Sequence, residues 1–95
     1  MELTENQKRF KEILTEVPRW VSDLFSFEND WVSLSRWPKL DGMSPHEKAM
    51  TAFVIMIYSG TNKHYPKQHI LEHFGGMDLQ KRQLIVDWCC KPFWL

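Results

Sequence analysis

The sequence has few cysteines, no net charge and no long apolar segment. Its only two cysteines, Cys89 and Cys90, are adjacent, so a disulfide between them would close no useful loop and we expect reduced thiols. Twelve basic and twelve acidic residues give a net charge of zero, which disfavours strong nonspecific attraction to nucleic acid or to an anionic membrane. These observations predict a cytoplasmic protein without a membrane partner, for which nucleic acid is a disfavoured partner.

Long apolar segments are also missing. The most apolar stretch covers only residues 49–58, about half of the roughly 20 residues that a helix needs to cross a bilayer. The first ten residues are polar, so we expect no signal peptide. No repeat, low-complexity tract or long linker divides the chain. We therefore expect one domain over residues 1–95, whose hydrophobic content of 43% suffices for a core without a metal or a disulfide.

The apolar stretch carries strong helix signals at both of its ends. Ser44 is a favoured N-cap, Pro45 suits the first helical position, and Glu47 completes a capping box with Ser44. Gly60 is well suited to end the helix in the left-handed conformation. We therefore expect a central helix over about residues 45–59, buried on nearly all sides.

Helical spacing of apolar residues predicts further short helices on both sides of the central one. They cover about residues 4–17, 18–25, 66–74 and 79–90, and one or two doubtful turns cover residues 31–35. No stretch predicts a convincing strand. The predicted fold class is therefore all-α: an irregular, orthogonal array of four to five short helices around the central helix.

One local pattern matches a catalytic motif. His69-Ile70-Leu71-Glu72-His73 has the H-x-x-E-H spacing in which two histidines bind zinc and the glutamate acts as a base. Such an enzyme needs a further ligand and a substrate cleft, and the rest of the sequence indicates neither. We expect no catalytic residues and no cofactor. A non-catalytic metal site at His64, His69 and His73, with a thiol of Cys89 or Cys90, stays open as an alternative.

A second alternative is DNA binding. Two helices joined by the short turn around Gly75 and Gly76, residues 66–90, are typical of a helix-turn-helix. In that interpretation the contacts to nucleic acid would come from Lys67, Lys81, Arg82 and Gln83.

The most prominent remaining feature is an excess of aromatic residues, with five tryptophans in 95 residues. Not all of these can be buried in so small a domain, and exposed tryptophan is enriched where proteins bind one another. The candidate partner-binding residues are Trp37 and the apolar end Phe93, Trp94 and Leu95. Alternatively, this tail folds back and covers the helices. We expect a non-enzymatic protein-interaction or regulatory module, whose partner is another protein or a second copy in a homodimer.

Overall fold

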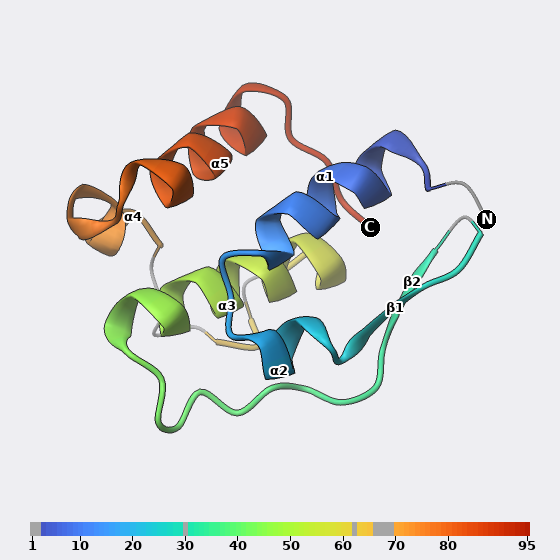
Figure 1. Cartoon of the computed structure of the whole chain (residues 1–95), viewed down its shortest axis with the longest axis horizontal. Helices are drawn as coiled ribbons and strands as arrows, with labels where there is room; N and C mark the ends of the chain where they lie inside the picture. The colour runs from blue at the N-terminus through green and yellow to red at the C-terminus, as the bar shows by residue number, and fades with distance from the viewer. Residues whose placement is uncertain (1–2, 30, 62, 66–69) are drawn as a thin grey trace.

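Helix α3, Pro45–Ser59, runs through the middle of the molecule and is covered by segments from both ends of the chain (Figure 1). The computed structural model describes residues 3–29, 31–61, 63–65 and 70–95. These residues form, in order, α1 (Glu5–Leu14), α2 (Arg19–Ser22), β1 (Phe25–Phe27), β2 (Val32–Leu34), α3, α4 (Ile70–His73), the 3₁₀ helix η1 (Phe74–Gly76) and α5 (Leu79–Cys90). No helix among the described residues is long and apolar enough to cross a membrane.

The central helix is confirmed with the expected bounds. Ser44 and Glu47 form a reciprocal capping box, in which the Glu47 N–H donates to the Ser44 hydroxyl and the Ser44 N–H donates to the Glu47 carboxylate. Gly60 ends the helix at φ +78°, a conformation that side chains with a Cβ rarely adopt. Met50, Val54 and Ile57 are completely buried, as expected of a helix that is covered on nearly all sides.

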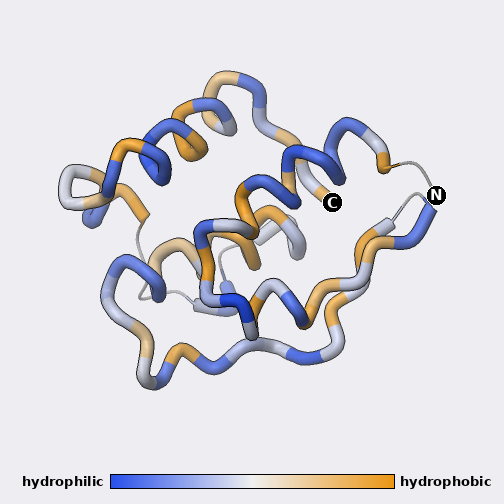
Figure 2. The backbone as a smooth tube through the Cα atoms, viewed as in Figure 1, coloured by the Kyte–Doolittle hydropathy of each residue, from blue (hydrophilic) through white to orange (hydrophobic). Residues whose placement is uncertain are grey.

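The flanking helices are largely confirmed, although they are shorter than expected. Helix α1 begins with a Thr4–Gln7 capping box but ends at Leu14, and Asp78 caps the start of α5. Figure 2 shows that α1 is mainly hydrophilic with apolar residues between, whereas apolar colour dominates the hairpin. The buried residues Phe10, Ile13 and Leu14 bring the apolar stripe of α1 into the core. The expected helix over 66–74 falls partly on residues 66–69, which lie outside the described residues.

The all-α prediction is wrong, because the chain also forms a small antiparallel sheet. The expected helix over 18–25 ends at Ser22, and the doubtful turns over 31–35 are strand β2. In the register of the hairpin, Phe25 lies opposite Leu34 and Phe27 opposite Val32, with Ser26 opposite Ser33. Both strands therefore alternate apolar and polar side chains, which places the four apolar side chains on one face. The fold is mostly helical, with this two-stranded sheet as a second component.

A buried glutamine joins the hairpin to the first helix. Gln7 is only 1% exposed, and its Nε2 donates to the backbone oxygens of Glu28 (2.7 Å) and Trp31 (3.1 Å). Its Oε1 accepts from the Thr4 N–H at 2.9 Å within the capping box. One side chain thus satisfies backbone groups at the start of α1 and at the end of the hairpin, which fixes the hairpin loop relative to the helix.

Replacing this glutamine by alanine should destabilise the domain. We expect Gln7→Ala to lower the free energy of unfolding by about 2–3 kcal/mol, because three backbone groups each lose a hydrogen bond and a cavity is left. Urea unfolding followed by circular dichroism measures this change. The neighbouring exposed Asn6 provides a matched control, since Asn6→Ala should change stability by less than about 0.5 kcal/mol. Equal stability of the two variants would show that the Gln7 bonds contribute little.

Candidate functional site: an aromatic groove

The C-terminal tail folds back onto the chain. The Leu95 N–H donates to the Ile57 oxygen of α3 at 3.2 Å, and the indole Nε1 of Trp88 donates to the Phe93 oxygen at 3.0 Å. Phe93 is only 5% exposed, and the Arg9 guanidinium lies 4.6 Å from the centre of its ring. The structure therefore places Phe93 in the core, and we leave it out of the candidate surface.

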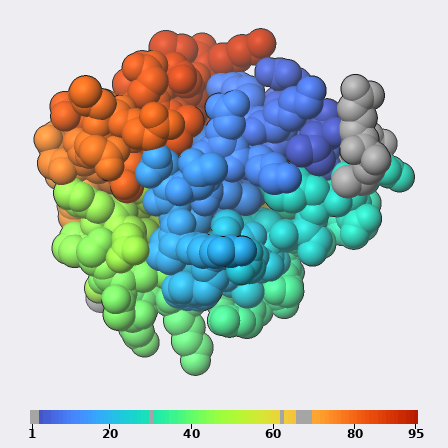
Figure 3. Space-filling view, viewed as in Figure 1, coloured from blue at the N-terminus to red at the C-terminus, as the bar shows by residue number. Residues whose placement is uncertain are grey.

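The next two residues of the tail stay at the surface. Trp94 is 50% exposed, and its ring meets the ring of Trp88 edge-on, with centroids 5.2 Å apart. Figure 3 shows the C-terminal part of the chain packed directly against the N-terminal helix. Arg9 helps to hold this arrangement, because its guanidinium donates to the Lys91 oxygen at 2.7 Å.

Trp94 and Leu95 lie at a hollow of about 500 Å³ that we call the aromatic groove. Segments far apart in the sequence build it: the start of α1, the hairpin, the last turn of α3 and the tail. The lining residues are Thr4, Asn6, Gln7, Trp31, Val32, Tyr58, Trp94 and Leu95. Four of these described residues are large apolar or aromatic side chains that reach the surface, and none of them is aspartate, glutamate, lysine or arginine.

Trp31 is the groove residue that sequence reasoning missed. It is 60% exposed, the highest exposed fraction of the five tryptophans. The signal was present in the alternation of the second strand, because Val32 and Leu34 face inward and the residue before Val32 must then face outward. Because residues 31–35 were interpreted as helical turns, this alternation of inward and outward side chains was not recognised.

Trp37 extends the aromatic surface on the other side of Tyr58. Its ring lies 6.3 Å from that of Tyr58 and stacks on the ring of His64 at 4.2 Å, yet Trp37 remains 48% exposed. The hydroxyl of Tyr65 donates to the Pro38 oxygen at 2.5 Å, which holds the segment after Trp37, and burial raises the pKa of Tyr65. Trp37 therefore borders the groove through Tyr58, although it does not line it.

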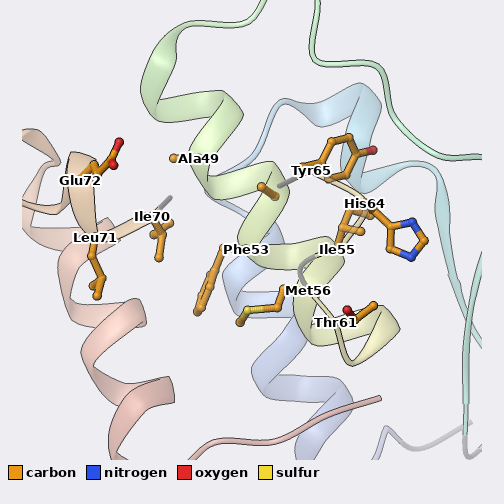
Figure 4. A pocket seen from close by; sticks show the side chains of 11 residues that line it. Ala49, Phe53, Ile55, Met56, Thr61, His64, Tyr65, Ile70, Leu71 and Glu72 are labelled. Carbon is orange, nitrogen blue, oxygen red and sulfur yellow. The ribbon is translucent and has the colours of Figure 1, made fainter. Parts of the chain in front are cut away.

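A second hollow, of about 400 Å³, lies between α3 and α4 (Figure 4). Phe53 and Met56 of α3 face Ile70 and Leu71 of α4, and Glu72 points away from them. Residues 66–69, which connect two of its walls in the sequence, lie outside the described residues. We base no function on this hollow.

The histidines of the alternative metal site have other neighbours. His64 stacks on Trp37, and the ring of His73 lies edge-on to that of His46 with centroids 5.8 Å apart. Cys89 and Cys90 are both exposed. No three histidine, cysteine, aspartate or glutamate residues cluster among the residues that the structure describes. His69, the first histidine of the H-x-x-E-H motif, lies outside them.

The residues of the DNA-binding alternative are engaged within the chain where the structure describes them. Lys81 forms ion pairs with Glu16 (3.2 Å) and Asp78 (3.1 Å). The Nε of Arg82 donates to the Met77 oxygen, and the amide of Gln83 donates to the Asp87 carboxylate. Lys67 lies outside the described residues. The Lys81 pairs connect the start of α5 to the end of α1, which is a structural role.

No family model, curated protein or solved structure matches this chain. A function therefore has to be inferred from the chain's own surface, and we base that inference on the aromatic groove.

The two aromatic residues of the tail should respond differently to truncation. Phe93→Ala should lower the free energy of unfolding by about 3–4 kcal/mol, because it leaves a cavity in the core. Trp94→Ala should cost only about 1 kcal/mol, since half of that side chain already faces water. Urea unfolding of both variants tests this difference. Equal losses would show that Trp94 is as much a core residue as Phe93.

The ion pairs at the start of α5 predict a pH dependence of stability. Hydrogen bonds from the backbone N–H and the ammonium group of Lys81 hold the pKa of Asp78 below its ordinary 3.8. Burial alone would lower the pKa of Lys81, but hydrogen bonds to Asp78 and Glu16 outweigh burial and raise it above 10.5. The stabilisation from Asp78 is therefore present above pH 3.8 and lost below it, and that from Lys81 is lost above pH 10.5.

Asp78→Asn isolates the acid limb, because it keeps an oxygen acceptor at the cap but does not titrate there. The advantage of the wild-type chain over this variant should be constant near neutral pH and should shrink as the pH falls from about 5 to about 2. Urea midpoints measured across that range test the expectation. A difference that does not change with pH would contradict the proposed role of the Asp78 charge.

Proposed function

We propose that this protein is a small, non-enzymatic protein-binding module of the cytoplasm that holds its partner in the aromatic groove. One observation carries the proposal. Trp31 and Trp94, from segments far apart in the sequence, are each at least half exposed and line the same hollow with Tyr58 and Leu95. Exposed aromatic patches of this kind mark partner surfaces, and tryptophan is enriched among residues that dominate binding energy.

The way the groove is supported favours binding. Gln7 holds the hairpin loop that carries Trp31 through its bonds to the Glu28 and Trp31 oxygens. The ring of Trp88 contacts the ring of Trp94 edge-on, and the indole N–H of Trp88 donates to the Phe93 oxygen. Aromatic side chains that are held in place before binding lose less conformational entropy when the partner arrives, so more of the contact energy appears as affinity.

The charge distribution predicts how the partner is recognised. None of the described residues that line the groove has an acidic or basic side chain, and the chain has a net charge of zero. Association should therefore depend little on salt and proceed without electrostatic steering. The exposed, unpaired cysteines Cys89 and Cys90 are compatible with a reducing compartment such as the cytoplasm.

DNA binding has less support, because Lys81, Arg82 and Gln83 already bind groups of their own chain. A DNA complex would have to break those contacts, and its affinity would fall steeply with salt. The two functions therefore predict different salt dependences of binding: weak for a protein partner in the groove and steep for DNA.

A photo-crosslinker at the groove tests the protein-binding proposal. Asn6 is exposed and lines the groove, whereas Leu79 is exposed at the start of α5 and does not. Benzoylphenylalanine at Asn6 should give a discrete protein adduct in cells, and the same group at Leu79 should not. The yield in lysate should not change when salt is raised roughly tenfold.

Tryptophan variants provide the matched control. Trp31→Ala and Trp94→Ala should suppress the Asn6 adduct, while Trp20→Ala should not, because Trp20 is exposed but lies outside the groove. An adduct of twice the chain's mass would identify a second copy as the partner. Adducts of equal yield from Asn6 and Leu79, or an adduct that survives both groove variants, would contradict the proposal.

A further inference from the structure

We infer that this protein associates with a second copy of itself through helix α5, with the two α5 helices side by side and parallel. The residues involved do not line the aromatic groove, so the inference is independent of the function proposed above. It follows from an apolar stripe on the outer face of α5 and from the charges on the two flanks of that stripe.

Helix α5 lies along one edge of the molecule (Figure 1) and is apolar on its outer face as well as on its inner one. Leu84 and Ile85 are buried in the core, whereas on the opposite face Leu79 is 76% and Val86 is 41% exposed. A surface helix usually turns polar residues to the solvent, and exposed apolar areas mark binding surfaces. The outer stripe of α5 consists of Leu79, Gln83, Val86 and Cys90, all of them exposed.

The spacing of the outer stripe is that of a two-stranded coiled coil. Its residues follow one another at intervals of four, three and four positions, which is how the d and a positions of a heptad alternate. A helix with the same spacing is the natural partner of such a stripe, and a second copy of the chain supplies one. Gln83 then occupies a single polar a position, which favours one register and a defined number of helices.

The charges beside the stripe determine the direction of the partner helix. Arg82 lies on one flank of the stripe and Asp87 on the other. When two parallel helices are related by a twofold axis along them, opposite flanks meet, so Arg82 of each copy faces Asp87 of the other. In an antiparallel pair the same flanks meet, which brings like charges together. Charge complementarity therefore favours the parallel pair, with two equivalent ion pairs.

Both charged groups can form these pairs without breaking a bond within the chain. Arg82 uses only its Nε–H for the bond to the Met77 oxygen, and a guanidinium has five N–H donors. Asp87 is exposed, and its carboxylate, which accepts from Gln83 through Oδ1, has capacity for further donors. Five helical positions separate the two residues by about 7.5 Å along the axis, which an arginine side chain can span.

The contact is small, because each copy supplies only the outer stripe and two charges. Small protein contacts are weak and transient, so we expect a Kd of roughly 10–100 µM. Benzoylphenylalanine at Leu79 removes one stripe residue, which weakens the contact further. With the chain expressed in cells at about 1 µM or less, Leu79 therefore remains a suitable control for the groove.

Sedimentation velocity of the whole protein between about 1 µM and 1 mM, under reducing conditions, measures the association. We expect a concentration-dependent shift from monomer to dimer. Val86→Glu places two carboxylates at the centre of the contact and should weaken association about tenfold or more. This variant should fold normally, since Val86 is exposed and glutamate favours helices, and circular dichroism checks it. Trp31→Ala, in the groove, is the control and should leave association unchanged.

A charge exchange tests the ion pairs. Asp87→Lys faces Arg82 of the second copy with a like charge and should weaken association about tenfold. Adding Arg82→Glu to this variant should restore the affinity, because opposite charges then meet again. If Arg82 only held its own chain through the Met77 oxygen, the second substitution would not rescue the first.

The two adjacent thiols report the direction of the helices. In a parallel pair, Cys90 of one copy meets Cys90 of the other on the axis, whereas Cys89 lies on a flank. Diamide takes up the two thiol hydrogens and leaves the sulfurs joined in a disulfide. At concentrations above the Kd, Cys89→Ser should still give a reducible dimer on gels, and Cys90→Ser should give much less.

Several results would overturn the inference. A protein that stays monomeric up to about 1 mM does not associate in this way, and association that survives Val86→Glu does not use the outer stripe. Association that is lost with Trp31→Ala would assign the contact to the groove. Equal crosslinking of the two serine variants, or none with Cys89→Ser, would contradict the parallel arrangement. None of these results except the loss with Trp31→Ala bears on the groove.

Discussion

Helix α3 is apolar on nearly all of its sides, and the rest of the structure depends on covering it. A soluble helix with one apolar stripe needs one neighbour, but a helix with Met50, Val54 and Ile57 completely buried needs several. In this chain the cover comes in short pieces: α1, the hairpin, α4 and the C-terminal tail. The aromatic groove lies where three of these pieces meet over the last turn of α3, with Tyr58 among its lining residues. It is therefore a consequence of how the core is closed.

Closing a core with short pieces requires specific joints between them, because none of the pieces is stable alone. Gln7 provides the joint between α1 and the hairpin. Arg9 joins α1 to the segment after α5 through the Lys91 oxygen, and Lys81 joins α5 to Glu16. These polar side chains also hold the groove, since Gln7 holds the loop of Trp31 and Arg9 lies over the tail before Trp94. Stability and the shape of the candidate site thus depend on the same few contacts.

The sequence predicted those elements whose signals are local. The capping boxes at Thr4 and Ser44 and the cap at Asp78 each involve residues within four positions of one another. A helix begins at each of the three positions. The hairpin was missed because each strand has three residues, and its loop lacks the glycine that marks most tight hairpins. A pattern such as Phe-Ser-Phe gains meaning only when Val-Ser-Leu is placed opposite it, and that pairing is not local.

The candidate site was predictable in the same partial way. Trp94 and Leu95 were expected at a surface and line the groove, but Phe93 points inward, because adjacent residues of an extended tail face opposite sides. The exposure of Trp31 could be predicted only from the alternation of strand β2, which the sequence analysis did not recognise. The direction of each aromatic ring is set by tertiary contacts that composition cannot supply. Counting tryptophans therefore predicted that an aromatic surface exists, and only the fold showed which tryptophans share one hollow.

The use of charge explains why an aromatic surface is the better candidate for binding. Cations that could have formed a nucleic-acid surface are occupied inside the chain: Lys81 with two carboxylates and Arg82 with a backbone oxygen. Their interaction energy is already used to hold α5 in place, so a ligand would have to compete with intramolecular contacts. Trp31 and Trp94, in contrast, still expose at least half of their side-chain surface to water. Burying that surface against a partner yields free energy without breaking any contact that holds the fold together.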